Sequence, residues 1–212
     1  MKILSLLLFS IAHLAAQEGY FKGGTYNPAI PTPRNVLGYE IGERFTDFRN
    51  LERYLDKLSV SSDRIRIIQY GETYERRPLR LLVISSPGTF SRLESIKSSN
   101  RRLTDPRLPG GKTETDEILK TLPAIAWLSY GVHGNESYSP EAAIMTAYQL
   151  CAGTDSRTQS ILDNLIVLID PAVNPDGRER APLDHRSAPE YKPQRDGTRR
   201  AVARRPNKSL FF

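Results

Sequence analysis

His133 and Glu136 stand three residues apart in the sequence GVHGNES, residues 131–137. An imidazole nitrogen and a carboxylate oxygen are both common zinc ligands, and this short spacing lets one loop supply two corners of a tetrahedral site. Gly131 and Gly134 flank the histidine and permit the tight backbone that turns both side chains to one side. A catalytic zinc ion takes a third protein ligand and keeps a fourth position open for water. The spacing therefore predicts half of a catalytic zinc site, with His133 and Glu136 as metal ligands.

The flanking residues predict where this loop lies in the fold. Residues 123–130 (PAIAWLSY) form a continuous apolar run, which is typical of a buried strand. Residues 140–152 predict a helix, because Pro140 and Glu141 stand in its first turn, where both are favourable. Loops at the carboxyl ends of sheet strands are where α/β folds keep their sites. The alternative is a solvated His–Glu pair in a glycine-rich loop, because the HxxE pattern alone is common.

Other segments predict an α/β fold with helices on both faces of a sheet. A second apolar run, residues 165–170, predicts another buried strand. Residues 65–70 and 79–85 predict a hairpin or an adjacent strand pair, joined by GETYERRP. Further helices are expected at 46–58, 90–100 and 158–164, and an extended loop at 19–38.

Four longer sequence blocks share an order and spacing that cover residues 35–180. They are GVHGNES at 131–137, DNLIVLIDPAVNPDGRER at 163–180, YEIGERFTDFRNLERYLDKL at 39–58 and YGETYERRPLRLLVISSP at 70–87. Together they resemble the zinc carboxypeptidase (carboxypeptidase A-like metallopeptidase) family, in its HGNE-bearing bacterial branch. The resemblance implies an α/β fold with a mixed, mostly parallel sheet flanked by helices, incomplete at the C-terminus. It also implies zinc-dependent hydrolysis of C-terminal peptide bonds in peptides or proteins.

The resemblance assigns roles to particular residues of the loop. His133 and Glu136 would be the first two zinc ligands, and Asn135 stands where other branches of the family carry a substrate-contacting arginine. The family's third ligand is a later histidine, its general base is a glutamate further on, and its substrate clamp is an Asn-Arg pair after NPDG. None of these three has a counterpart in this sequence.

A histidine and two arginines that follow the NPDG motif are weaker site candidates. His185 is a candidate third ligand, but it lies too early for the family order and is expected to be a solvated surface residue. Arg178 and Arg180 are expected to be exposed rather than to anchor substrate. No catalytic residue is therefore assigned within the chain, and the 212-residue product is expected to bind zinc weakly and to be inactive.

Two other functions stay open on the sequence alone. One is a zinc amidohydrolase of the aspartoacylase or succinylglutamate desuccinylase type, which shares the HxxE metal-binding pattern. The other is a non-catalytic secreted binding protein, because a formal charge of +6 could attract nucleic acid. A nucleic-acid site needs aromatic or groove-reading partners on folded elements, so we expect peptide C-termini rather than nucleic acid as partners. No oligomeric state is predicted.

Residues 1–16 (MKILSLLLFSIAHLAA) have the layout of a secretory signal peptide, with Lys2, a short apolar run and then small residues. A buried N-terminal helix is the alternative. The run is far shorter than the ~20 residues that cross a bilayer, so a secreted or periplasmic protein without stable membrane insertion is expected. The one cysteine, Cys151, excludes a disulfide framework and a cysteine zinc module. It is expected to pack within the helix at 140–152.

The excess of basic residues lies at one end of the chain. Residues 1–177 contain 20 basic and 20 acidic residues, whereas residues 178–212 contain 10 and 4. Codons compatible with residues 200–212 also encode, in a shifted frame, the family stretch EPWPGGRTNHYFFD. We therefore expect four parts: a signal peptide at 1–16, an extended segment at 17–38, the N-terminal portion of a zinc carboxypeptidase domain at 39–177, and a basic, out-of-frame tail at 178–212.

The nucleotide sequence tests this frameshift. We expect the frame to shift between Gly177 and about Arg199, so that the alternative frame, read past the stop codon, encodes a DLNR-type motif and then a histidine and a glutamate. Sequencing the gene is the measurement. A shifted frame without those residues would refute the frameshift and favour a genuine basic tail.

Overall fold

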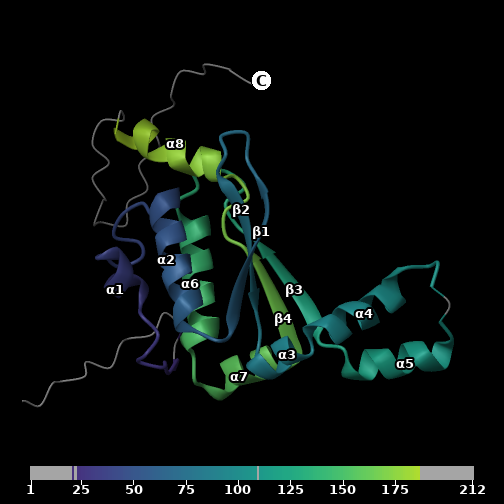
Figure 1. Ribbon diagram of the computed structural model, residues 1–212. Helices are drawn as coiled ribbons and strands as arrows, with labels where there is room; N and C mark the ends of the chain where they lie inside the picture. The colour runs from purple at the N-terminus through teal and green to yellow at the C-terminus, as the bar shows by residue number, and fades with distance from the viewer. Residues whose placement is uncertain (1–20, 22, 109, 187–212) are drawn as a thin grey trace, which may run out of the picture.

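The computed structural model describes residues 21, 23–108 and 110–186, and for residues 182–186 it describes only the backbone. Helices and strands are interspersed along the chain, as expected of an α/β fold (Figure 1). Their bounds, in chain order, are α1 Pro33–Leu37, α2 Phe48–Ser61, β1 Ile65–Glu72, β2 Pro78–Ile84, α3 Pro87–Ser91, α4 Leu93–Thr104, α5 Lys112–Thr121, β3 Ala124–Ser129, α6 Tyr138–Ala152, α7 Ser156–Asn164, β4 Leu165–Asp170 and α8 Pro175–Arg186.

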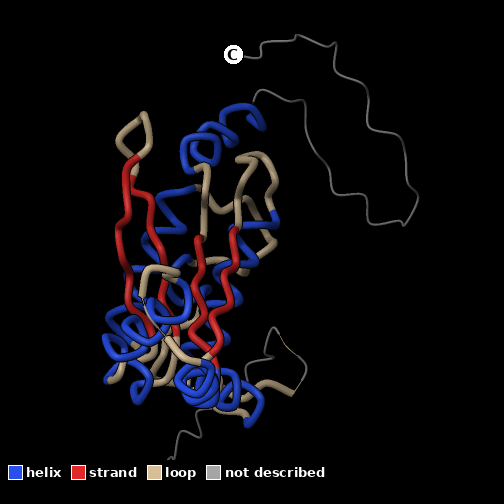
Figure 2. The backbone as a smooth tube through the Cα atoms, turned by 90° about the vertical axis from the view of Figure 1, so that its right-hand side faces the viewer, coloured by secondary structure: helices blue, strands red, loops and turns tan. Residues whose placement is uncertain are grey.

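The four strands form one mixed sheet in the order β1-β2-β4-β3 (Figures 1 and 2). β1 pairs antiparallel with β2 through the predicted hairpin, and β2 pairs antiparallel with β4. β3 and β4 pair in parallel, with Ser129 opposite Asp170. The α/β class and the mixed sheet are confirmed. Over the described residues the sheet is not mostly parallel, because the short β1–β2 turn can join only antiparallel neighbours and β4 continues that pattern on β2.

Helices α2 and α6 cover one face of the sheet (Figure 1). Helix α2 begins after Asp47, whose carboxylate accepts the Asn50 N–H at 2.7 Å and caps the helix. Leu51, Leu55 and Leu58 recur at helical spacing and are 0 to 1% exposed. They belong to the main core, together with buried residues of β2, β4 and α6. The predicted amphipathic helix therefore packs through the face that its apolar spacing indicated.

The opposite face of the sheet is only partly covered by the described residues. A small apolar cluster from β2, β4, α3 and α4 packs there (Val83, Ile166, Phe90 and Ile96). Strand β3 lies at the edge of the described sheet, and its Ile125 and Trp127 are 47% and 64% exposed. The strand predicted at 123–130 is confirmed, but the prediction that it is buried is wrong: β3 lies at the edge of the described sheet, and its residues are exposed or half-buried.

Helices α1 and α8 lie outside the segments that the sequence predicts to be helical. Helix α1 interrupts the extended segment, because Thr32 caps it through the Asn35 N–H at 3.1 Å and Pro33 occupies its first position. Helix α8 crosses the boundary between residues 177 and 178 and continues to Arg186. Its sequence has little apolar periodicity, and tertiary contacts described below hold its first turns.

Both ends of the chain lie outside the described residues, including the signal peptide expected at 1–16 and residues 187–212 of the basic tail. Among the described helices, none is long and apolar enough to span a membrane. Cys151 is buried in α6, as predicted, and burial raises the pKa of its thiol to about 12.

Leu58→Ala is expected to lower the free energy of unfolding by about 2–5 kcal/mol, because it removes a fully buried side chain and leaves a cavity. Urea-induced unfolding followed by circular dichroism measures the change. Val60→Ala, on the same helix at a position 80% exposed, is the matched control and should change this free energy by less than about 0.5 kcal/mol. Equal losses in the two variants would contradict packing of α2 through its leucine face.

Candidate metal centre

The loop of residues 131–137, here called the ligand loop, links the carboxyl end of β3 to the start of α6. It closes as a turn in which the Glu136 N–H donates to the His133 carbonyl at 3.2 Å. The side chains of His133 and Glu136 are both exposed. One short turn therefore makes an imidazole and a carboxylate accessible to a ligand from solution.

Gly131 begins the ligand loop in a conformation that suits glycine. Its φ is +67°, in the left-handed region, and its N–H donates to Ser139 Oγ at 2.7 Å. A Cβ at this position would lie 3.1 Å from Pro140 Cγ and 3.2 Å from Ala172 Cα. The hydrogen bond and the close contacts hold the start of the loop against α6 and the end of β4.

A second loop, residues 171–174, leaves the carboxyl end of β4, runs beside the ligand loop and leads into α8. The Val173 N–H donates to the Tyr130 carbonyl at 2.9 Å, and the Asn174 N–H to the Gly131 carbonyl at 3.0 Å. The Asn174 side-chain amide donates to the Val132 carbonyl at 3.2 Å. Because β3 and β4 are parallel, their carboxyl ends lie side by side, and both loops leave the sheet there. α/β folds place their sites at this end of the strands.

The ligand loop and the first turn of α8 come very close at Gly134 and Gly177. A Cβ on Gly134 would lie 1.9 Å from the Gly177 carbonyl carbon and 2.3 Å from the Arg178 nitrogen. Asn174 fixes the other side of this contact, because its Oδ1 accepts the Gly177 N–H at 2.9 Å and caps α8, with Pro175 at the first helical position. Glycine at 134 is therefore required by the packing of the ligand loop on α8.

Arg178, in the first turns of α8, is 1% exposed. Its Nε donates to the Thr46 carbonyl at 2.9 Å. Its Nη1 donates to the Glu136 carbonyl at 3.1 Å, and its Nη2 to the Ser137 carbonyl at 3.3 Å. The expectation that Arg178 is exposed is wrong, because α8 places this side chain between the ligand loop and the segment that precedes α2.

The positive charge of Arg178 has partners inside the protein. Glu141 is 6% exposed, lies 3.7 Å from Arg178 Nη2 and accepts the Thr46 N–H at 2.9 Å. The Phe45 ring centroid lies 3.6 Å from the guanidinium carbon, which is a cation–π contact. Burial lowers the pKa of Arg178 to about 10, and the Glu141 carboxylate acts in the opposite direction. The guanidinium therefore stays charged at neutral pH.

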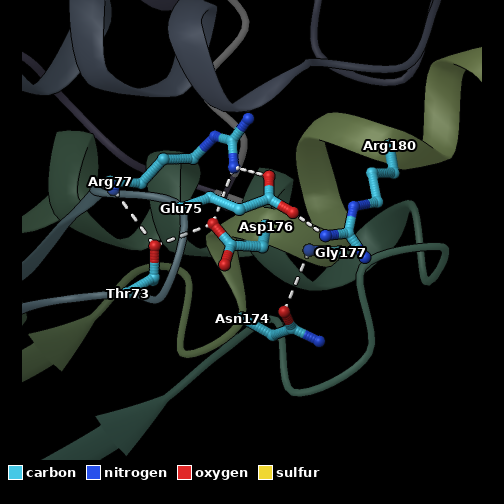
Figure 3. A network of polar contacts seen from close by, with 7 residues as sticks. All are labelled: Thr73, Glu75, Arg77, Asn174, Asp176, Gly177 and Arg180. Carbon is cyan, nitrogen blue, oxygen red and sulfur yellow. Dashed lines mark hydrogen bonds and ion pairs between the residues drawn. The ribbon is translucent and has the colours of Figure 1, made fainter.

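A second set of contacts ties α8 to the β1–β2 turn (Figure 3). Asp176 accepts the Thr73 hydroxyl at 2.8 Å and Arg77 Nη1 at 2.7 Å. Glu75 pairs with both Arg77 and Arg180. The Arg180 side chain is 66% exposed, as predicted. Figures 1 and 2 place the β1–β2 turn and α8 at the same end of the sheet, where this network joins them.

Asp170 is a buried acidic residue at the carboxyl ends of β3 and β4 that no sequence motif indicated. It ends β4, is 5% exposed, and accepts the Tyr70 hydroxyl at 2.5 Å, while its Oδ1 has no hydrogen-bond partner among the described residues. Burial raises the pKa of Asp170, and the bond from Tyr70 opposes that shift. Burial and the Asp170 carboxylate raise the pKa of Tyr70 to about 12, so the phenol stays a donor at neutral pH. An acidic residue that ends an apolar strand was the only available sequence signal.

The donors of the ligand loop fit part of a zinc site. Zinc binds imidazole nitrogen and carboxylate oxygen, which are the two donor types at His133 and Glu136. Within the described part of the chain, no three His, Cys, Asp or Glu side chains gather into a group that could hold a metal ion. Asn135 is exposed in the loop, and His185 lies in α8 with its side chain outside the described residues. The described structure therefore contributes two candidate ligands.

A family model, a curated protein and two solved structures show similarity to this chain. The sequence model of the zinc carboxypeptidase family matches residues 51–203. Carboxypeptidase A4 of Mus musculus is 26% identical over 162 residues, which are 76% of this chain and 28% of that protein. The crystal structure of carboxypeptidase A from Helicoverpa armigera is 15% identical, with a TM-score of 0.46 over 70% of this chain and 32% of that one. The crystal structure of thrombin activatable fibrinolysis inhibitor is 15% identical, with a TM-score of 0.44 over 72% of this chain and 29% of that one. The chain thus spans less than a third of the length of each relative.

Gly134→Ala is expected to lower the free energy of unfolding by about 1–3 kcal/mol or more, because the new Cβ meets backbone atoms that cannot rotate away. Thermal unfolding measures the change. Gly88→Ala in α3 is the matched control, since a Cβ there meets only Ser86 Oγ at 3.9 Å. We expect this control to be unchanged or about 0.4–1 kcal/mol more stable. If the two variants unfolded alike, the close packing of the ligand loop on α8 would be disproved.

Proposed function

This chain belongs to the zinc carboxypeptidase family, and from that premise we propose that His133 and Glu136 are two protein ligands of the catalytic zinc ion in a metallocarboxypeptidase. The proposed substrates are peptides or proteins, cut at their C-terminal peptide bond. The observation that carries the proposal is the position of the ligand loop at the carboxyl ends of the parallel strands β3 and β4, with both side chains exposed.

The residues around the two ligands hold the loop in one conformation. Gly131 starts the turn, and Gly134 lets the loop pack on α8. The Asn174 amide and the Arg178 guanidinium donate hydrogen bonds to its backbone carbonyls. A bound zinc ion supplies the Lewis acid that peptide hydrolysis uses. The chain's own contribution is a pair of donors on a loop whose backbone is already hydrogen-bonded.

Catalysis requires more groups than this loop provides. A catalytic zinc site takes three protein ligands, and hydrolysis takes a general base. The described residues bring no third His, Cys, Asp or Glu to His133 and Glu136, and the chain spans 28% of the length of the curated relative. We therefore propose that the 212-residue chain by itself binds zinc weakly and does not turn over peptides.

The site of action and the fine specificity are part of the same proposal. The signal-like residues 1–16 support export, so the protein is proposed to act outside the cytoplasm or in the periplasm. Asn135 takes the place of the arginine that other branches carry, so a substrate contact of that kind would have to come from another residue.

Zinc titration of the metal-free protein by calorimetry tests the ligand assignment. Changing a residue that only supports a metal ligand typically weakens metal affinity roughly 10–100-fold. His133→Ala and Glu136→Gln should each weaken zinc affinity by more than this, because each removes a ligand. Two matched controls, His185→Ala and Glu94→Gln, should leave the affinity unchanged. Unaltered binding in both ligand variants would overturn the assignment, and loss in His185→Ala alone would move the site to α8.

A substrate panel tests the proposed inactivity of the chain and the amidohydrolase alternative. We expect the 212-residue chain to hydrolyse neither peptides nor N-acyl amino acids at a measurable rate. Peptide turnover by the purified, sequence-verified chain would refute its inactivity. Turnover of N-acyl amino acids alone would replace the peptidase by the amidohydrolase.

A further inference from the structure

Arg178 contacts the ligand loop through the backbone of one of the two candidate ligands. Its guanidinium donates to the Glu136 carbonyl at 3.1 Å and to the next carbonyl, Ser137, at 3.3 Å. The carboxylate side of Glu136 is exposed, whereas its carbonyl faces a side chain that is 1% exposed. The arginine therefore holds Glu136 from the protein interior and leaves its carboxylate accessible.

The hydrogen-bond geometry of Arg178 requires the loop to adopt this shape. Its Nε, Nη1 and Nη2 donate to three different carbonyls, two of which belong to the ligand loop. A buried guanidinium that lost the loop would leave donors unpaired, which is costly in the protein interior. Glu141 does not replace those carbonyls, because its oxygen lies 3.7 Å from Arg178 Nη2, beyond hydrogen-bond distance.

A lysine at position 178 could not reproduce this arrangement. Three carbonyls around a planar, forked guanidinium match its fixed donor directions, whereas an ammonium is a compact charge on a flexible stem. The ring of Phe45, 3.6 Å from the guanidinium carbon, also suits a flat cation. The contacts therefore depend on the planar shape of the arginine side chain as well as on its charge.

We infer that Arg178 is a positioning residue for metal binding: its guanidinium holds the backbone of Glu136 and Ser137 so that the ligand loop is formed before a metal ion arrives. The metal part of this inference rests on the proposed function. A loop that is already ordered loses less conformational entropy on binding, so the zinc affinity is higher than for a mobile loop.

Two readouts test the role of Arg178, one with zinc and one without. In the metal-free chain, Arg178→Met should speed hydrogen exchange of the Glu136 amide by at least about tenfold, because its bond to the His133 carbonyl depends on the held turn. In zinc titrations the same variant should bind about 10–100-fold more weakly. Arg178→Lys keeps the charge and should show both effects in smaller degree.

Arg180→Met is the matched control, because Arg180 lies on the same helix but pairs with Glu75 of the β1–β2 turn. It should change neither the Glu136 amide exchange nor the zinc affinity. If Arg178→Met does not fold, Arg178→Lys decides by the same two readouts. Lower global stability with wild-type amide exchange and wild-type zinc affinity would overturn the inference. If Arg178→Met speeds exchange of the Glu136 amide but the wild-type chain binds no zinc, the proposed function is overturned and the positioning of the loop by Arg178 is supported.

Discussion

The ligand loop and the start of α8 can approach each other only because Gly134 carries no side chain at their point of contact. A single methyl group there would overlap the Gly177 carbonyl group. This approach brings the ligand loop carbonyls within hydrogen-bond distance of Arg178, the residue that follows Gly177. Gly134 thus permits the close approach, and Arg178 forms the hydrogen bonds that this approach makes possible.

Burial of the Arg178 charge is costly, and the surrounding groups determine whether the fold can tolerate it. Three carbonyl oxygens, the Glu141 carboxylate and the Phe45 ring replace the water that the guanidinium loses. Such an arrangement contributes little net stability, because desolvation offsets most of the attraction. Its effect is selective: it disfavours every loop conformation that leaves a charged donor unpaired.

Hydrogen bonds, rather than packing of other side chains against β3, hold the backbone around the candidate site. Mid-strand residues Ile125 and Trp127 are 47% and 64% exposed. The end of the same strand is nevertheless fixed, since Tyr130 bonds to both Asp170 and Val173 of the neighbouring strand and loop. Asn174 and Asp176 extend this framework to the ligand loop and to the β1–β2 turn.

The sequence by itself determined the elements whose signal is local. The leucine spacing of α2, the hairpin of β1 and β2, the apolar run of β4 and the His133–Glu136 spacing are all readable within about 20 residues, because periodicity and turn chemistry act over short distances. Only the tertiary structure decided the burial of Arg178, the packing need for Gly134 and the exposure of β3. The bonds of Arg178 join residues 42 and 132 positions apart, and no local pattern records which distant carbonyls will surround a side chain.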